Sequence, residues 1–167
     1  KYGHLTIASD AVIHGDYAVI LFQKAVGANN FGSTIDVYGT LKGNLWVMGN
    51  ITTDLATAKN PCVVNVHDGA VIESGADNVG IALNGAAKMT VGKANITSET
   101  GIEVRAGELT VNGATVEATA QEFSCVPNGN GTTTVGAAIA IAQHTTKQNI
   151  AVTINGGSFK GVKALNE

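Results

Sequence analysis

The chain has little of what marks several common classes of protein. Its 167 residues hold two cysteines, two prolines and a single arginine, Arg105, and the formal net charge is -3. Proteins that bind nucleic acids or anionic membranes rely on clustered lysine and arginine, so this composition argues against both partners. Two cysteines are too few for a disulfide framework, and no Cys/His spacing indicates zinc. Cys62 and Cys125 either form one disulfide bond, if the loop around Cys125 folds down, or remain two unpaired thiols.

Long apolar runs are also missing. The longest, residues 135–142, spans eight residues, whereas a helix needs about 20 apolar residues to cross a bilayer. We therefore expect no insertion into a membrane. The chain opens at Lys1 without methionine, signal peptide or anchor, and it stops just past a repeat. We expect it to be a processed or excised piece of a longer protein.

What the chain does contain is a repeated pair of short segments that alternate apolar and polar residues around a glycine or Asn-Gly bend. Alternation with period two indicates strands, and recurrence predicts that each copy stacks on the next instead of folding back as a hairpin. Four copies occur: Val64–Val66 with Gly69–Glu73, Met89–Val91 with Ala94–Thr97, Leu109–Val111 with Gly113–Glu117, and Val152–Ile154 with Gly156–Lys160.

The intervals between copies predict the kind of stack. Val66 and Val91 are 25 residues apart, and Val91 and Val111 are 20 apart. A third apolar pair follows each copy, as at Ile81 and Leu83, so each coil holds three strands. Two wider coils precede the copies, which predicts about five to six coils in all. We therefore expect one all-β domain over residues 1–167, a right-handed parallel β-helix (β-solenoid), with small or branched residues facing inward: Ala70, Ile72, Ala94, Ile96, Ala114, Val116, Gly157 and Phe159.

The coil that departs from the repeat is the first candidate for a binding site, since solenoid proteins usually differ in function through their loops. A surplus loop at 121–134 and a smaller one between Ile141 and Val152 flank the strand 138–142. Its outward alanines, Ala138, Ala140 and Ala142, predict a flat shelf between polar walls. Such a shelf suits the edge of a saccharide, or the loops are simply solvated and bind nothing. The candidate ligand-binding residues are Phe123 as a stacking platform, His144, Lys147 and Asn149 as hydrogen-bonding groups, and Glu103 and Arg105 beside the shelf, which otherwise form an exposed ion pair.

A second candidate is the outward face of each coil's first strand. Rows of polar side chains are expected there: Asp36 with Tyr38, Asn65 with His67, Thr90, Thr110 with Asn112, and Thr153 with Asn155. Such rows suit hydroxyl-rich ligands, or they merely stabilise a solvated parallel sheet. Asp36, His67 and Asp68 are the residues that would form an acid/base or metal cluster here. No motif for a cofactor or a metal occurs, and we expect neither.

The runs Val111–Glu117 and Val152–Gly161 resemble the coil repeats of pectate-lyase-like right-handed β-helix domains. In particular they are similar to those in large surface proteins of gut Firmicutes and related bacteria. The resemblance covers residues from about 35 to 162 and rests on the repeat alone. It implies an extracellular scaffold at the cell surface, often adhesive or facing carbohydrate. The acidic calcium ligands of pectate lyases and the neighbouring aspartates of polygalacturonases have no counterpart at matching positions.

Two functions follow as hypotheses. The favoured one is a non-catalytic surface module, a stalk or adhesin whose partner is a polysaccharide, a host or bacterial surface glycan, or a protein. The alternative is a small polysaccharide lyase or glycoside hydrolase that uses Asp36, His67 and Asp68, or Glu103 and Arg105; it requires carboxylates about 4 to 9 Å apart in a groove. Ice binding through threonine arrays is a distant third. Uncapped solenoid ends also predict end-to-end self-association.

Overall fold

The computed structural model describes residues 3–23, 32–49, 54–75, 79–129, 131–143 and 147–167. Within them the chain is almost entirely β-structure: a 14-stranded sheet, a separate two-stranded sheet and one short 3-10 helix, η1 (Leu55–Thr57). Every pairing in the large sheet is parallel, and successive strands along it come from distant parts of the chain. The all-β class and the parallel stacking of the repeats are therefore confirmed, in an arrangement consistent with a β-solenoid.

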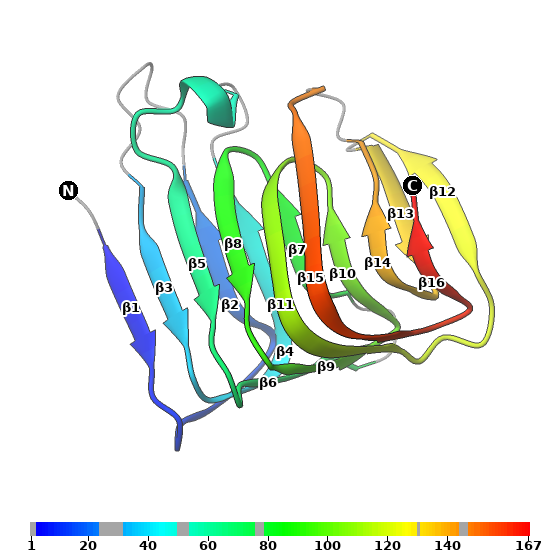
Figure 1. Cartoon of the computed structure of the whole chain (residues 1–167), viewed down its shortest axis with the longest axis horizontal. Coiled ribbons are helices and arrows are strands. Elements are labelled where there is room, and N and C mark those ends of the chain that lie inside the picture. The colour runs from blue at the N-terminus through cyan, green and yellow to red at the C-terminus, as the bar shows by residue number, and fades with distance from the viewer. Residues whose placement is uncertain (1–2, 24–31, 50–53, 76–78, 130, 144–146) are drawn as a thin grey trace.

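The first strands of successive repeats lie side by side from the N-terminal to the C-terminal end (Figure 1). The inner ones alternate buried and more exposed residues, as in the buried-intermediate pattern of Cys62–Val66, whereas the strands at the two ends of the row are mostly exposed. The strands are β1 (His4–Ile7), β3 (Thr34–Val37), β5 (Cys62–Val66), β8 (Ala87–Val91) and the opening parts of β11 (Gly107–Ala118) and β15 (Ile150–Lys160). One row of residues in register runs across these strands and consists of Leu5, Ile35, Val64, Met89, Leu109 and Val152.

The other strands of the sheet continue around two further faces. The second face holds β6 (Val71–Glu73), β9 (Asn95–Ser98), the first parts of β2 (Val12–Phe22) and β4 (Thr40–Met48), and the last parts of β11 and β15. The third holds the last parts of β2 and β4 with β7 (Val79–Asn84), β10 (Thr100–Val104), β14 (Ala137–Ile141) and β16 (Lys163–Asn166). The strands β2, β4, β11 and β15 thus run through a corner where the repeat predicts a break.

The core is a set of aliphatic rows between these faces. Ile72, Ile96 and Val116 are in register and at most 1% exposed, and Phe159 packs against them. Stacking like side chains at strand spacing buries each one between its neighbours above and below, which is the main stabilising contribution of such a core. The predicted inward positions are confirmed from Ala70 to Val116, while Gly157, near the C-terminal end of the stack, is exposed.

The surplus loop is more ordered than expected. Two of its segments, β12 (Ser124–Asn128) and β13 (Gly131–Val135), form an antiparallel hairpin, which pairs with no strand of the large sheet. Figure 1 shows it at the C-terminal end of the stack, beside β14. We call it the hairpin below. Its position decides which outward residues are covered.

The two cysteines are free. Cys62 is buried in β5, where its thiol donates a hydrogen bond to Oε1 of Gln23 (3.0 Å), and burial raises its pKa above the ordinary value. Cys125 is exposed on the hairpin. The disulfide bond between them is not formed. Among the described residues, no helix has the length and apolar character needed to cross a membrane.

Candidate functional site

The expected shelf on the third face is covered. Ala140 is fully buried and Ala142 is 5% exposed, although both lie on or beside β14. The hairpin lies against this face: the amide of Thr134 donates to Oε2 of Glu103 (3.0 Å), and the hydroxyl of Thr100 donates to the carbonyl of Thr134 (2.6 Å). The loop that was expected to wall the shelf therefore closes it, and an open saccharide shelf at this position is wrong.

Glu103 and Arg105 lie under the same cover. Nε of Arg105 donates to Oε1 of Glu103 at 2.6 Å, with the two side chains 9% and 1% exposed, respectively. The expectation of an exposed pair is therefore wrong. Burial raises the pKa of Glu103, and the positive charge of Arg105 opposes that rise. The pair joins the hairpin to the sheet and is out of reach of a polymer.

The remaining residues of the predicted loop site are split between two places. Phe123 precedes the hairpin and is half-buried, with Nζ of Lys163 5.8 Å from its ring centroid. Lys147 and Asn149 line an open cavity of about 640 Å³ together with Gln143 and Glu167. His144 lies outside the described residues. The structure thus brings Lys147 and Asn149 together and separates both from Phe123.

The first face carries a more compact group of polar side chains, centred on Asp36 in β3. Nε2 of His4 lies 2.7 Å from Oδ2, Nε2 of His67 lies 2.8 Å from Oδ1, and Nδ2 of Asn65 donates to Oδ1 at 3.0 Å. These four residues are the Asp36 cluster. The hydrogen bonds from His67 and then His4 lower the pKa of Asp36 to about 2. Since an ionised carboxylate only accepts, both Nε2 atoms must carry a proton.

Strand register explains why these residues meet. Thr6, Asp36 and Asn65 form one row on the outward face, which places Asn65 directly beside Asp36. His67 follows Asn65 by two positions on the same face, and His4 precedes Thr6 by two. The pairing of Asp36 with His67 is the one that the repeat predicts. His4 was missed, although its offset from Thr6 in the same alternation was a usable signal.

A groove of about 400 Å³ opens beside the Asp36 cluster. It is lined by Tyr38, Asn65, Val66, His67, Asp68, Thr90, Gly92 and Asn112, and we call it the Tyr38 groove. The rings of Tyr38 and His67 are stacked, with centroids 3.9 Å apart and planes 9° apart. Tyr38, His67 and Gly92 directly follow the neighbouring strands β3, β5 and β8. Their amides donate to the carbonyls of Ile7, Val37 and Val66, which holds the three residues side by side. Gly92 lines the groove beside His67 and Asp68 and adds no side chain to it.

Asp68 belongs to this groove and not to the Asp36 cluster. Its Oδ1 accepts from the amide of Lys93 at 2.7 Å, which holds the carboxylate against Gly92. The expected trio of Asp36, His67 and Asp68 is therefore divided: His67 contacts Asp36 and also lines the groove with Asp68, whereas Asp36 is not part of the groove lining. Among the residues that the structure describes, no group of three or more His, Cys, Asp or Glu side chains could hold a metal ion.

What the groove can do is bind hydroxyl groups. It presents a carboxylate, two amides and a threonine hydroxyl next to a flat two-ring stack, and the Asp36 cluster holds His67 in place. Comparison of the chain with family models, with curated proteins and with solved structures found no match.

Proposed function

We propose that the chain is a right-handed parallel β-helix of about five to six coils, with three strands per coil, that serves as a non-catalytic, extracellular scaffold of the adhesin type. Support comes from the in-register parallel stacking of six first-face strands and from the resemblance of its repeats to pectate-lyase-like domains of bacterial surface proteins. A stack of this kind presents rigid outward faces on which a ligand can be held without rearrangement.

The ligand class that we propose is a saccharide, bound in the Tyr38 groove. The stacked pair of Tyr38 and His67 carries this proposal. Saccharide rings present apolar C–H faces that pack on flat aromatic surfaces, and their hydroxyls need donors and acceptors around the rim. Asn65, Thr90 and Asn112 supply both, and Asp68 supplies an acceptor.

The cavity at Lys147 and Asn149 fits a saccharide less well. Its described lining is polar at Gln143, Lys147 and Asn149 and aliphatic at Ile141, Ile150 and Val152, and it includes no aromatic ring. Hydrogen-bonding groups alone exchange bonds with water for bonds with hydroxyls, which yields little net free energy. The Tyr38 groove adds the stacking surface that this cavity lacks.

A binding role suits the Asp36 cluster better than catalysis. A general acid or base works best with a pKa near the working pH. The pKa of Asp36 is about 2, and both of its oxygens already accept hydrogen bonds from His4, Asn65 and His67. Asp36 is therefore a weak base at neutral pH, and its arrangement favours holding His67 for stacking.

The test is binding of the labelled chain to an array of plant, mucosal and bacterial glycans, with and without calcium, followed by titration calorimetry with the strongest binder. Tyr38→Ala should weaken binding at least about tenfold, because it removes one of the two aromatic rings and the stacking contact that holds the His67 ring in place. Phe22→Ala is the matched control, since Phe22 is an exposed aromatic residue on β2, outside the groove. It should leave affinity unchanged.

Other outcomes would change the function. Equal affinity of wild type and Tyr38→Ala would place the saccharide elsewhere and overturn the assignment of the binding site to the Tyr38 groove. Shortened or unsaturated sugars, found by mass spectrometry of each array position, would make the chain a polysaccharide lyase or hydrolase. Absence of binding to every glycan would leave a spacer or a protein-binding adhesin.

A further inference from the structure

A second open concavity lies at the corner between the second and third faces. His14, Lys42 and Glu73 are in register, so the residues that follow them, Gly15, Gly43 and Ser74, are neighbours at this corner. Gly43 has a φ of +138°, and a Cβ there would overlap the carbonyl oxygen of Gly15. Two glycines and a small serine in succession leave the corner without bulk. The result is a hollow of about 640 Å³, which we call the corner hollow, lined by Gly15, Asp16, Lys42, Gly43, Glu73, Ser74 and Gly75.

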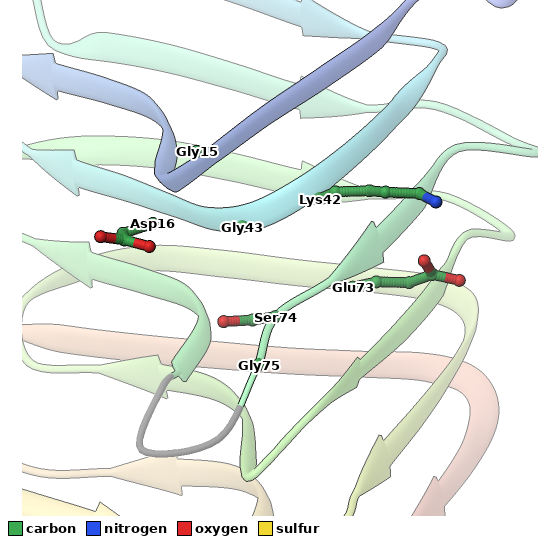
Figure 2. A pocket seen from close by; sticks show the side chains of 7 residues that line it. All are labelled: Gly15, Asp16, Lys42, Gly43, Glu73, Ser74 and Gly75. Atoms are coloured by element: carbon green, nitrogen blue, oxygen red, sulfur yellow. The ribbon is translucent and has the colours of Figure 1, made fainter.

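The charged side chains of the corner hollow stand on two sides of it. Figure 2 shows Lys42 and Glu73 pointing to one side, and Asp16 and the Ser74 hydroxyl pointing to the other. The two carboxylates therefore do not converge on one point, as a glycosidase pair does. Among the described residues, none forms an ion pair or a hydrogen bond with the side chains of Asp16, Lys42 or Glu73.

Two buried polar atoms at this corner have no hydrogen-bond partner. They are the hydroxyl oxygen of Ser74 and Oδ1 of Asn44, a residue that is 2% exposed and directly follows Gly43. Buried polar atoms are nearly always satisfied by protein, water or ligand, because an unpaired one costs roughly 1 to 3 kcal/mol. Of the two residues only Ser74 lines the hollow, so a hydroxyl group bound there is a suitable partner for the Ser74 hydroxyl.

An aromatic pair stands next to the corner hollow. Tyr17 directly follows Asp16, is 54% exposed and meets Trp46 edge to face, with ring centroids 5.8 Å apart and planes at 79°. Contact with Trp46 limits how the Tyr17 ring can turn. Neither ring is among the residues that line the hollow, so the pair flanks the corner without forming a wall of the site.

We propose that the corner hollow is a second ligand site, separate from the Tyr38 groove, and that it binds sugar units carrying a free amino group. Two unpaired carboxylates against one ammonium give the hollow an excess of negative charge, which favours a cationic ligand and repels uronates. The amino group binds at a carboxylate, and the sugar hydroxyls bind Ser74 and Lys42.

The test uses a glucosamine oligomer, with an N-acetylglucosamine oligomer of the same length as the uncharged comparison, in titration calorimetry with the full chain. The glucosamine oligomer should bind at least about tenfold more tightly. Gly75→Leu should abolish this binding without altering charge: a Cβ at Gly75 meets nothing within 4 Å, so the leucine fills the hollow and leaves the backbone undisturbed. Gly129→Leu is the matched control, since a Cβ there also meets nothing within 4 Å and the residue lies in the turn of the hairpin, outside the lining of the hollow.

Three results would overturn the proposal: equal affinity for the two oligomers, wild-type affinity in Gly75→Leu, or loss of binding in Tyr38→Ala with retention in Gly75→Leu. Circular dichroism checks that Gly75→Leu folds. If it does not, the double variant Asp16→Asn, Glu73→Gln decides, because it keeps the shape of the hollow and removes both negative charges. That variant should lose the preference for the amino sugar while binding in the Tyr38 groove is unchanged.

Discussion

The carboxylate of Asp36 accepts hydrogen bonds from His4, Asn65 and His67, and its side chain is 16% exposed. This environment stabilises the ionised form, so the pKa falls from 3.8 to about 2. An acidic residue whose pKa is lower in the folded than in the unfolded chain stabilises the fold at pH values above its pKa in the unfolded chain. That stabilisation is lost as pH falls through the folded value.

We therefore expect Asp36 to make stability depend on pH between about 4 and 2. The free energy of unfolding should decrease over this range by about 1 to 2 kcal/mol more in the wild type than in Asp36→Asn, after allowance for solvent screening. Urea unfolding at a series of pH values measures both curves. Parallel curves for the two proteins would show that the hydrogen bonds to His4 and His67 do not favour the carboxylate.

Among the secondary-structure elements, the hairpin depends on only a few contacts for its position. It pairs with no strand of the large sheet, and β12 is exposed along its length. Hydrogen bonds attach it to the third face through Glu103, Thr100 and the amide of Gly136, which donates to the carbonyl of Glu99. Of these three contacts, only the one made by Glu103 involves a side chain that also neutralises a buried charge, that of Arg105.

Glu103→Ala should therefore destabilise the chain by about 3 kcal/mol, because it leaves Arg105 buried without a partner and removes the acceptor of Thr134. Glu108→Ala is the control: Glu108 pairs with Lys88 at 3.5 Å, but its side chain is 49% exposed. That change should cost under about 1 kcal/mol. Urea unfolding gives both values, and hydrogen exchange should show faster exchange at Thr134 in Glu103→Ala alone. Equal losses in the two variants would contradict this account of the hairpin.

For the whole molecule, the notable surfaces are the two ends of the stack. Of the exposed large hydrophobic side chains in the described part of the chain, five lie on β1 and β2 and three on or beside β15 and β16, whereas only Tyr38 and Val126 lie elsewhere. Small concavities open at both ends, one lined by Leu5, Leu21 and Ile35 and the other by Ile139, Val152 and Leu165. Edge strands with apolar rows are templates for a further strand.

We propose that two copies of this chain stack end to end, with Leu5 of one copy continuing the row that Val152 closes in the other. Sedimentation velocity should then show association that grows with concentration. Leu165→Lys should abolish it, and Val126→Lys should not, although both residues are 57% exposed. A monomer that persists at high concentration would rule the stacking out.

Much of this fold could be predicted because alternation reports directly which face a residue occupies. Ile72, Ile96 and Val116 recur at the repeat interval, and they are the residues found stacked in the core. The outward pairing of Asp36 with His67 followed from the same alternation. The Gly-lined corner hollow was not predicted, since it depends on Gly15, Gly43 and Ser74 meeting at one corner, and the wider early coils obscure that register.

The sequence by itself determined the all-β class, the parallel stacking and the inward rows, because strand period and repeat interval are local properties of the chain. Only the tertiary structure decided which outward residues are open. Alternation places Glu103, Ala140 and Asp36 alike on the outside, yet the hairpin buries the first two, and Asp36 stays in a solvated cluster. Whether an outward residue is covered depends on where a loop folds relative to a distant strand. The position of the loop follows from long-range contacts such as that of Thr134 with Glu103, and the period of the sequence does not reveal such contacts.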